Sequence, residues 1–182
     1  MPNRTPTLTD DEVRFYKENG YLLYKKQLFS ADKLNGLKTL ADEHFANRGD
    51  RRGDELDTPH FHDPRLLDYL LSDEVLDLVE PITGPDIALW SSAFLIKEPR
   101  IGRSTPWHED SAYWEGRVSG YDIVTVWIAL GRSGKENGCM RVIPGTHVNG
   151  FSEYEAVDGS TNTFHSQIKR VDESEAVYFE LD

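Results

Sequence analysis

The sequence predicts an α+β fold, with helices first along the chain and antiparallel strands after them. Apolar residues recur three and four positions apart in residues 9–84, which is the spacing of amphipathic helices. After Gly84-Pro85 the composition shifts to β-branched and aromatic runs. Because helices and strands do not alternate, the pattern favours an antiparallel β-domain with helices packed on it over a doubly wound parallel sheet.

The first two predicted helices have start and stop signals. Thr9 and Glu12 have the spacing of a capping box, and Gly20 is placed to end the helix that they begin. Ser30 is the predicted N-cap of a second helix, which stops near Gly49. The apolar residues of this second helix recur at helical spacing and are Leu34, Leu37, Leu40, Ala41 and Phe45.

The segment between the helices and the strands mixes loop and helix signals. Residues 47–60 are charged and contain two glycines, which indicates a mobile surface loop. Helical spacing returns at 66–71, and Ser72 is placed to cap a short helix that Pro81 limits.

The predicted strands lie in the second half. The two long ones are 87–97 and 121–130, and the shorter ones are 141–143, 164–171 and 176–181.

Length, charge and cysteine content narrow the class of protein. The chain has 182 residues, which suits a single domain, with a mainly helical flank at 1–84 and a β core at 85–182. The sequence has 32 acidic and 20 basic residues, and its net charge of −12 disfavours nucleic-acid and anionic-membrane partners. Cys139 is the one cysteine, and neither a membrane-length apolar run nor a signal peptide is present. We therefore expect a soluble, cytoplasmic protein.

The segment at 105–114 holds the strongest candidate for chemistry. In an extended strand, His108 and Asp110 project to the same face, while Glu109 projects to the other. One imidazole and one carboxylate are two thirds of the facial triad that holds Fe(II) and leaves positions open for oxygen chemistry. The alternative is that both side chains belong to a solvated loop, because an acidic protein contains such triplets by chance.

Four stretches in chain order, the segment at 107–114 among them, carry a family resemblance. The stretches are FLIKEP at 94–99, WHED followed by YW at 107–114, VTVWIAL at 124–130, and NGCMRVIPGTH at 137–147. With the opening pattern at 9–21, they resemble the phytanoyl-CoA dioxygenase family of non-haem Fe(II)- and 2-oxoglutarate-dependent oxygenases. The resemblance covers residues 8–182. It implies a double-stranded β-helix (a jelly-roll, cupin-like core) with the N-terminal helices packed outside.

The resemblance implies roles for four residues in holding cofactors. His108 and Asp110 match two iron ligands. Lys97 matches a position whose ammonium reaches the 2-oxoglutarate carboxylate, and Trp127 matches one that lines the co-substrate pocket. Lys97 as an exposed strand-end lysine and Trp127 as a plain core tryptophan remain alternatives.

The resemblance also implies the reaction and the partners. Tyr113 and Trp114 match a position at the substrate pocket, although both could instead pack beneath the loop. The implied activity is hydroxylation of a small organic substrate with dioxygen. Asp110 favours hydroxylation, because related halogenases have a small residue in place of the carboxylate. Nothing in the sequence forms a basic patch for a CoA phosphate, so the substrate stays open.

One part of the family pattern is missing. The resemblance places a second histidine ligand, and an arginine for 2-oxoglutarate, after the segment matched by 176–182. We therefore expect a C-terminally truncated domain that lacks its last core strands, is inactive alone, and either dimerises through its open edge or is only marginally stable alone. His165 is a less favoured substitute ligand, and His147 belongs to a turn that in the family is structural or near the site but does not supply the iron ligand. The other histidines are interpreted as solvent-exposed (His60, His62) or as packed or surface (His44).

Two other classes of function are alternatives. The first is a non-catalytic binding or structural module that keeps the fold without a complete metal site. The second is a zinc hydrolase, which ranks last because no second histidine stands four residues from His108.

Overall fold

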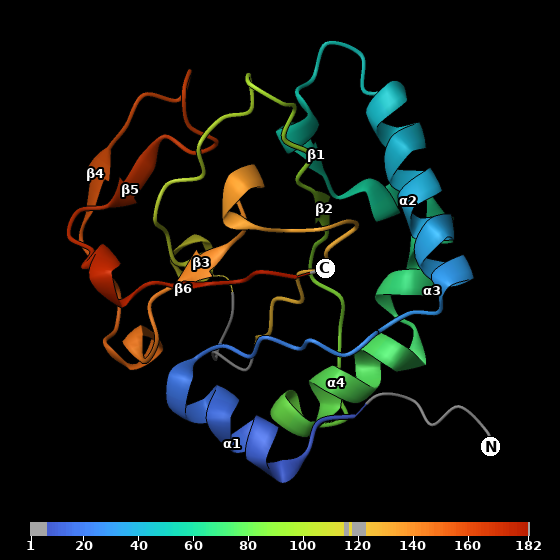
Figure 1. Ribbon diagram of the computed structural model, residues 1–182, viewed down its shortest axis with the longest axis horizontal. Coiled ribbons are helices and arrows are strands. Elements are labelled where there is room, and N and C mark those ends of the chain that lie inside the picture. The colour runs from blue at the N-terminus through green and yellow to red at the C-terminus, as the bar shows by residue number, and fades with distance from the viewer. Residues whose placement is uncertain (1–6, 115–116, 118–122, 182) are drawn as a thin grey trace. The chain divides into compact units, whose positions relative to one another are not determined.

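The computed structural model describes residues 7–114, 117 and 123–181. The helices within these residues are α1 (Asp10–Asn19), α2 (Ala31–Ala46), α3 (Leu67–Leu70) and α4 (Asp73–Thr83). The strands are β1 (Leu56–Asp57), β2 (Ala93–Phe94), β3 (Arg141–Val142), β4 (Tyr154–Ala156), β5 (Ser166–Ile168) and β6 (Val177–Tyr178) (Figure 1). They form the antiparallel pairs β1–β2, β3–β6 and β4–β5. Mixed helices and antiparallel strands agree with the predicted α+β class.

The finer expectation, a double-stranded β-helix, is not shown by the described residues, whose strands are two or three residues long. Of the predicted strand 87–97 the structure forms β2 alone, and residues 123–130 form no strand. Residues 121–122 of the other long prediction lie outside the described residues. A β-branched run favours extended backbone, but a strand also needs a partner for its N–H and C=O groups.

The chain divides into two compact units. The first contains the described residues up to 13, together with 24–101 and 124–130. The second contains 14–23 and the described residues of 102–123 and 131–182. No helix in the described part of the chain is long and apolar enough to cross a bilayer.

Local helix signals are confirmed. The Thr9 hydroxyl accepts the Glu12 N–H at 3.2 Å, and the Glu12 carboxylate accepts the Thr9 N–H at 2.8 Å, which completes the predicted capping box. Ser30 accepts the Lys33 N–H at 3.2 Å and so caps α2. Gly20 ends α1 at a φ of 78°, a left-handed conformation that glycine adopts without strain.

The two sequence signals that predicted the start and the end of α4 agree less closely with the structure. Ser72 stands at the N-cap position, but its hydroxyl donates to the Tyr69 carbonyl instead of accepting a helix N–H. Pro81 does not end the helix, which continues to Thr83 and stops at Gly84, where φ is 88°. A proline removes one helical hydrogen bond, and the last turn of α4 tolerates that loss.

The prediction of a mobile loop at 47–60 is wrong. The segment contains β1, whose Leu56 is 3% exposed and pairs with Phe94. A Cβ on Gly53 would come within 2.4 Å of the Ile96 carbonyl oxygen, so this close approach requires glycine. His60, interpreted above as solvated, is 8% exposed, and its Nδ1 lies 2.6 Å from the Ser92 hydroxyl. Its imidazole is thus a buried structural group.

The core of the first unit lies between α2 and the segment that contains α3 and α4. Its buried members are Phe29, Leu37, Leu40, Leu66 and Val75. Side chains from distant parts of the chain pack against them, including Phe94, Ile128 and Leu130. The helical spacing of α2 therefore identified part of this core correctly.

A buried carboxylate ties α2 to the turn that precedes α3. Asp63 accepts two hydrogen bonds from the Arg65 guanidinium, at 2.9 and 2.7 Å, and lies 3.1 Å from His44 Nε2. His44 also packs on the Phe94 ring, so its interpretation as a packed residue is confirmed. The Arg65 hydrogen bonds hold the pKa of Asp63 well below its usual range.

The Asp63 carboxylate predicts an acid-sensitive first unit. A carboxyl whose pKa is lower in the folded chain stabilises it above an unfolded value of about 4, and this stabilisation is lost as pH falls toward the folded pKa. We expect Asp63→Asn to reduce the free energy of unfolding at pH 7 by about 1–3 kcal/mol and to weaken its decline below pH 4. Urea unfolding at several pH values measures both, with Asp68→Asn on the exposed side of α3 as control. Equal pH profiles for Asp63→Asn and the parent chain would contradict the assignment.

The second unit is held by strand pairs and by contacts to the end of α1. In Figure 1, β4–β5 lies at the upper left, and β3–β6 lies below it at mid-height, left of the centre. The Tyr21 ring packs on buried Phe179, with centroids 5.4 Å apart. His147 Nε2 donates to the Lys17 carbonyl at 3.0 Å, which supports the structural role expected for its turn.

Candidate functional site

The segment that holds His108 and Asp110 is extended but is not part of a strand. Glu109 has φ −118° and ψ 125°, and Asp110 begins a 3₁₀ turn, Asp110–Tyr113. Because the backbone is extended at Glu109, the alternation of side chains expected for a strand holds locally. His108 and Asp110 consequently meet on one side of the segment.

The imidazole and the carboxylate are close enough to bind the same metal ion. His108 Nε2 lies 3.4 Å from Asp110 Oδ1. His108 Nδ1 lies 2.8 Å from the Pro106 carbonyl oxygen, which can only accept, so Nδ1 carries the proton of this hydrogen bond. In the neutral ring, Nε2 then presents its lone pair toward the side on which Asp110 lies.

These two donors fit a divalent metal ion. Neighbouring donors on an octahedral ion with bonds of about 2.1 Å stand about 3 Å apart, close to the observed separation. A backbone carbonyl that accepts the second ring N–H is the usual outer partner of a metal-binding histidine. Among the described residues, no three His, Cys, Asp or Glu side chains gather as a metal site. The described residues therefore bring together two candidate donors for such an ion.

Aromatic rings surround the His108 side of the pair. The Phe164 ring lies 4.8 Å from the imidazole, edge to face, and the Tyr113 ring lies 6.5 Å from it. Tyr113 and Phe164 are themselves 5.6 Å apart. Burial raises the pKa of the Tyr113 phenol, with smaller contributions from Tyr154 and Asp110, so the phenol stays protonated at neutral pH. Trp114 is half-buried at the end of the 3₁₀ turn.

Trp107 ties the start of the segment to β5 and to Glu173. Its carbonyl accepts the Ile168 N–H at 2.8 Å, and its indole N–H donates to Glu173 at 2.9 Å. The Arg141 guanidinium lies 4.5 Å above the ring and also pairs with Glu173. These contacts tie the residue before His108 to β5 and β3.

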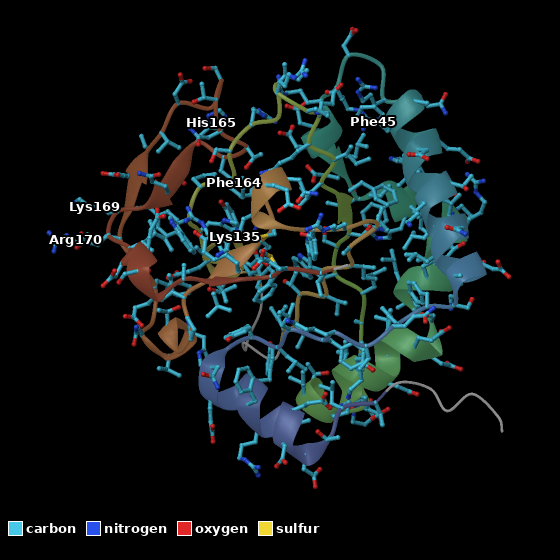
Figure 2. The ribbon with its side chains drawn as sticks, viewed as in Figure 1. Phe45, Lys135, Phe164, His165, Lys169 and Arg170 are labelled. Atoms are coloured by element: carbon cyan, nitrogen blue, oxygen red, sulfur yellow. The ribbon has the colours of Figure 1, made fainter. Side chains whose placement is uncertain are left out.

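The predicted substitute ligand does not join the pair. Phe164 and His165 are neighbours, but Phe164 packs on His108 while His165 is exposed (Figure 2). The His165 ring lies against Gly159, where an added Cβ would meet its Cε1 at 2.3 Å. Lys169 and Arg170, which follow β5, project outward into solvent (Figure 2).

Lys97 and Trp127 belong to the first unit. Lys97 follows β2 and is exposed, yet burial around its stem lowers the pKa of its ammonium, and the Asp54 carboxylate opposes that shift. The Asp54 side chain is 3% exposed and lies in the 3₁₀ turn packed against the β2 region. Trp127 is half-buried. Their cofactor-binding roles, like those of Tyr113 and Trp114 at the substrate pocket, stay predictions.

A mixed α+β fold with a candidate His–Asp metal-binding pair agrees with a metal-dependent oxygenase. Comparison with known proteins shows the family to which the chain belongs. The model of the family "Phytanoyl-CoA dioxygenase (PhyH)" matches residues 16–182, so the chain belongs to this family, as its motifs indicated. Among curated relatives, the mouse peroxisomal phytanoyl-CoA dioxygenase is 30% identical over 91% of this chain, and the human one 28% over 93%. The chain spans 56% and 57% of their lengths.

Solved structures support the fold. EvdO2 from Micromonospora carbonacea var. aurantiaca aligns with a TM-score of 0.67 over 98% of this chain and 79% of its own. A crystal structure of EvdO2 complexed with 2-oxoglutarate aligns with a TM-score of 0.65 over the same shares. The sequences are 20% and 21% identical, so the likeness concerns the fold alone.

Sequence reasoning missed the groups that hold the donor pair in place. Glu109 was expected to point away from the pair, but its partners, Ser152 and Tyr154, have no local signal in the sequence. The contact of Phe164 with His108 was likewise not predicted. The spacing of His108 and Asp110 indicates that Glu109 projects to the other face of the segment. It does not indicate which distant segment packs against that face.

Proposed function

We propose that this chain carries the iron-binding segment of an Fe(II)- and 2-oxoglutarate-dependent dioxygenase that hydroxylates a small organic substrate. The observation that carries the proposal is the pair His108 Nε2 and Asp110 Oδ1, 3.4 Å apart, within a sequence that belongs to the phytanoyl-CoA dioxygenase family. Iron with 2-oxoglutarate and dioxygen would supply the oxidising power, while the protein supplies orientation and a dry environment.

The described residues have distinct tasks in this proposal. The Pro106 carbonyl fixes the proton on His108 Nδ1, so that Nε2 of the neutral ring carries the lone pair that binds metal. Asp110 supplies negative charge that partly neutralises a divalent ion. Phe164 and Tyr113 cover one side of the imidazole and reduce access of water to it. The family resemblance places the remaining histidine ligand in sequence after the segment that 176–182 resembles.

Lys97 is assigned to the co-substrate. An ammonium suits a carboxylate of 2-oxoglutarate, and a charge-assisted hydrogen bond contributes about 1.5–3 kcal/mol. The lowered pKa of Lys97 leaves the amine less strongly protonated than a free lysine, and an anionic ligand beside it would raise that pKa again.

The test is turnover of 2-oxoglutarate by the product of the full reading frame, with Fe(II) and dioxygen, against a panel of candidate substrates. We expect consumption of 2-oxoglutarate that requires Fe(II) and is lost in His108→Ala. Lys97→Ala should raise the dissociation constant of 2-oxoglutarate about tenfold to a hundredfold, whereas Lys25→Ala, at an exposed lysine, should not. Absence of both Fe(II)-dependent turnover and metal-dependent binding of 2-oxoglutarate would instead indicate a non-catalytic module.

A further inference from the structure

Glu109 stands between the two metal donors, and its side chain is turned toward the opposite face. One carboxylate oxygen accepts the Ser152 hydroxyl, and the other accepts the Ser152 N–H at 3.2 Å. Glu109 is half-buried, and so is Ser152. A carboxylate that receives both donors of one residue is a two-point attachment, which restricts rotation as well as distance.

The backbone of Glu109 is attached at the same place. Its N–H donates to the Tyr154 phenol oxygen at 2.9 Å. Tyr154 begins β4 and pairs with Ile168 of β5, whose N–H donates to the Trp107 carbonyl. Burial raises the pKa of the Tyr154 phenol, so it is neutral when it accepts this bond. Residues 107 and 109 are thereby both fastened to the β4–β5 pair.

This attachment controls where the donors point. The segment is extended at Glu109 but belongs to none of the strands β1–β6. The regular hydrogen bonds of a strand pair therefore do not fix its backbone orientation. His108 and Asp110 keep side-chain exposures of 25% and 42%, so packing constrains them less than it would in a core. Because Glu109 shares one peptide unit with His108 and the other with Asp110, a rotation of the backbone at Glu109 would turn both donors, and the bonds to Ser152 and Tyr154 oppose that rotation.

We propose that Glu109 is a positioning residue of the metal site, which acts by fastening the His108–Asp110 segment to Ser152 and Tyr154. The inference rests on the proposed function, because it assigns Glu109 a task only if His108 and Asp110 bind metal. Glu109 does not touch the metal in this arrangement. Removing outer partners of metal ligands lowers metal affinity by about 10–100-fold, and this is the size of effect expected here.

Two substitutions separate the hydrogen bonds of Glu109 from its charge. Glu109→Ala removes both bonds. Glu109→Gln can keep both, because its amide oxygen accepts the Ser152 N–H and its amide N–H donates to a rotated Ser152 hydroxyl. The matched control is Glu153→Ala, which removes a 79% exposed glutamate beside Ser152 that pairs with Lys169 at 3.6 Å.

The experiment titrates Co(II) into the parent protein and the variants, and records the visible spectrum at saturating metal. We expect Glu109→Ala to bind Co(II) about tenfold more weakly and with an altered spectrum, which a loss of global stability alone would not produce. Glu109→Gln should restore both readouts, and Glu153→Ala should match the parent. Ser152→Ala should weaken binding, and adding it to Glu109→Ala should weaken it no further, because both remove one link.

The outcomes distinguish this inference from the function on which it rests. If His108→Ala weakens Co(II) binding but Glu109→Ala binds with the affinity and spectrum of the parent, Glu109 is not a positioning residue and the metal site stands. If Glu109→Gln is as weak as Glu109→Ala, the carboxylate acts through its charge and the inference is overturned. If the parent protein binds no Co(II), or His108→Ala binds it equally well, both proposals fail.

Discussion

Replacing His108 by alanine should lower the affinity for a divalent metal probe by about a hundredfold, and Asp110→Ala should do the same. Structural zinc sites with four ligands bind with about 10–16 kcal/mol, or roughly 3 kcal/mol per ligand, which corresponds to about a hundredfold. We expect the same loss of metal affinity for both substitutions, because His108 Nε2 and Asp110 Oδ1 lie 3.4 Å apart and each supplies one donor to the same ion in the proposed site. Titration with Mn(II) or Co(II) under anaerobic conditions measures it.

His165→Ala is the control for this experiment. His165 is exposed and lies against Gly159, and Phe164 beside it contacts the His108 ring. We expect the His165 variant to bind metal as the parent protein does. A loss as large as that of His108→Ala would make His165 a metal ligand, and would contradict the proposal that His108 and Asp110 are the two donors among the described residues.

The helices could be predicted because their signals are local. A capping box needs Thr9 and Glu12, three residues apart, and the structure forms both of its hydrogen bonds. Ser30 accepts a backbone N–H three residues ahead, and Gly20 ends α1 with a left-handed φ. Each interaction is complete within one turn of helix, so the sequence window that predicts it also contains it.

The strands could not be placed to the same degree, because a strand depends on a partner far along the chain. Leu56 pairs with Phe94 across 38 positions, within a charged segment that reads as loop. Residues 123–130 have a strong preference for extended backbone, but they pair with no strand among the described residues. Propensity indicates which residues tolerate a strand, whereas pairing decides where one forms.

The candidate site divides in the same way. The spacing of His108 and Asp110 places them on one face, and the structure brings their polar atoms together. The groups that hold the segment lie 43 to 66 positions away, at Ser152, Tyr154 and Glu173. Nothing at 107–110 identifies them, since hydrogen-bond partners between distant segments are determined by tertiary packing.

Leu66→Ala should reduce the free energy of unfolding by about 3–4 kcal/mol, because it opens a cavity in the core of the first unit. Leu66 is 2% exposed and belongs to the cluster that also contains Phe29 and Leu37. A loss of this size is a large fraction of the about 5–15 kcal/mol that stabilises a typical domain. Urea unfolding measures it as a lower midpoint at an unchanged slope.

Leu71→Ala is the matched comparison, because it makes the same chemical change five residues away at a side chain that is 41% exposed. Water already reaches this leucine, so its removal opens no closed cavity, and the cost should stay below about 1 kcal/mol. The difference between the two variants isolates burial from helix propensity, since Leu66 ends a 3₁₀ turn and Leu71 directly follows α3. Equal losses would show that the packing between α2 and the 64–83 segment does not carry the stability of the first unit.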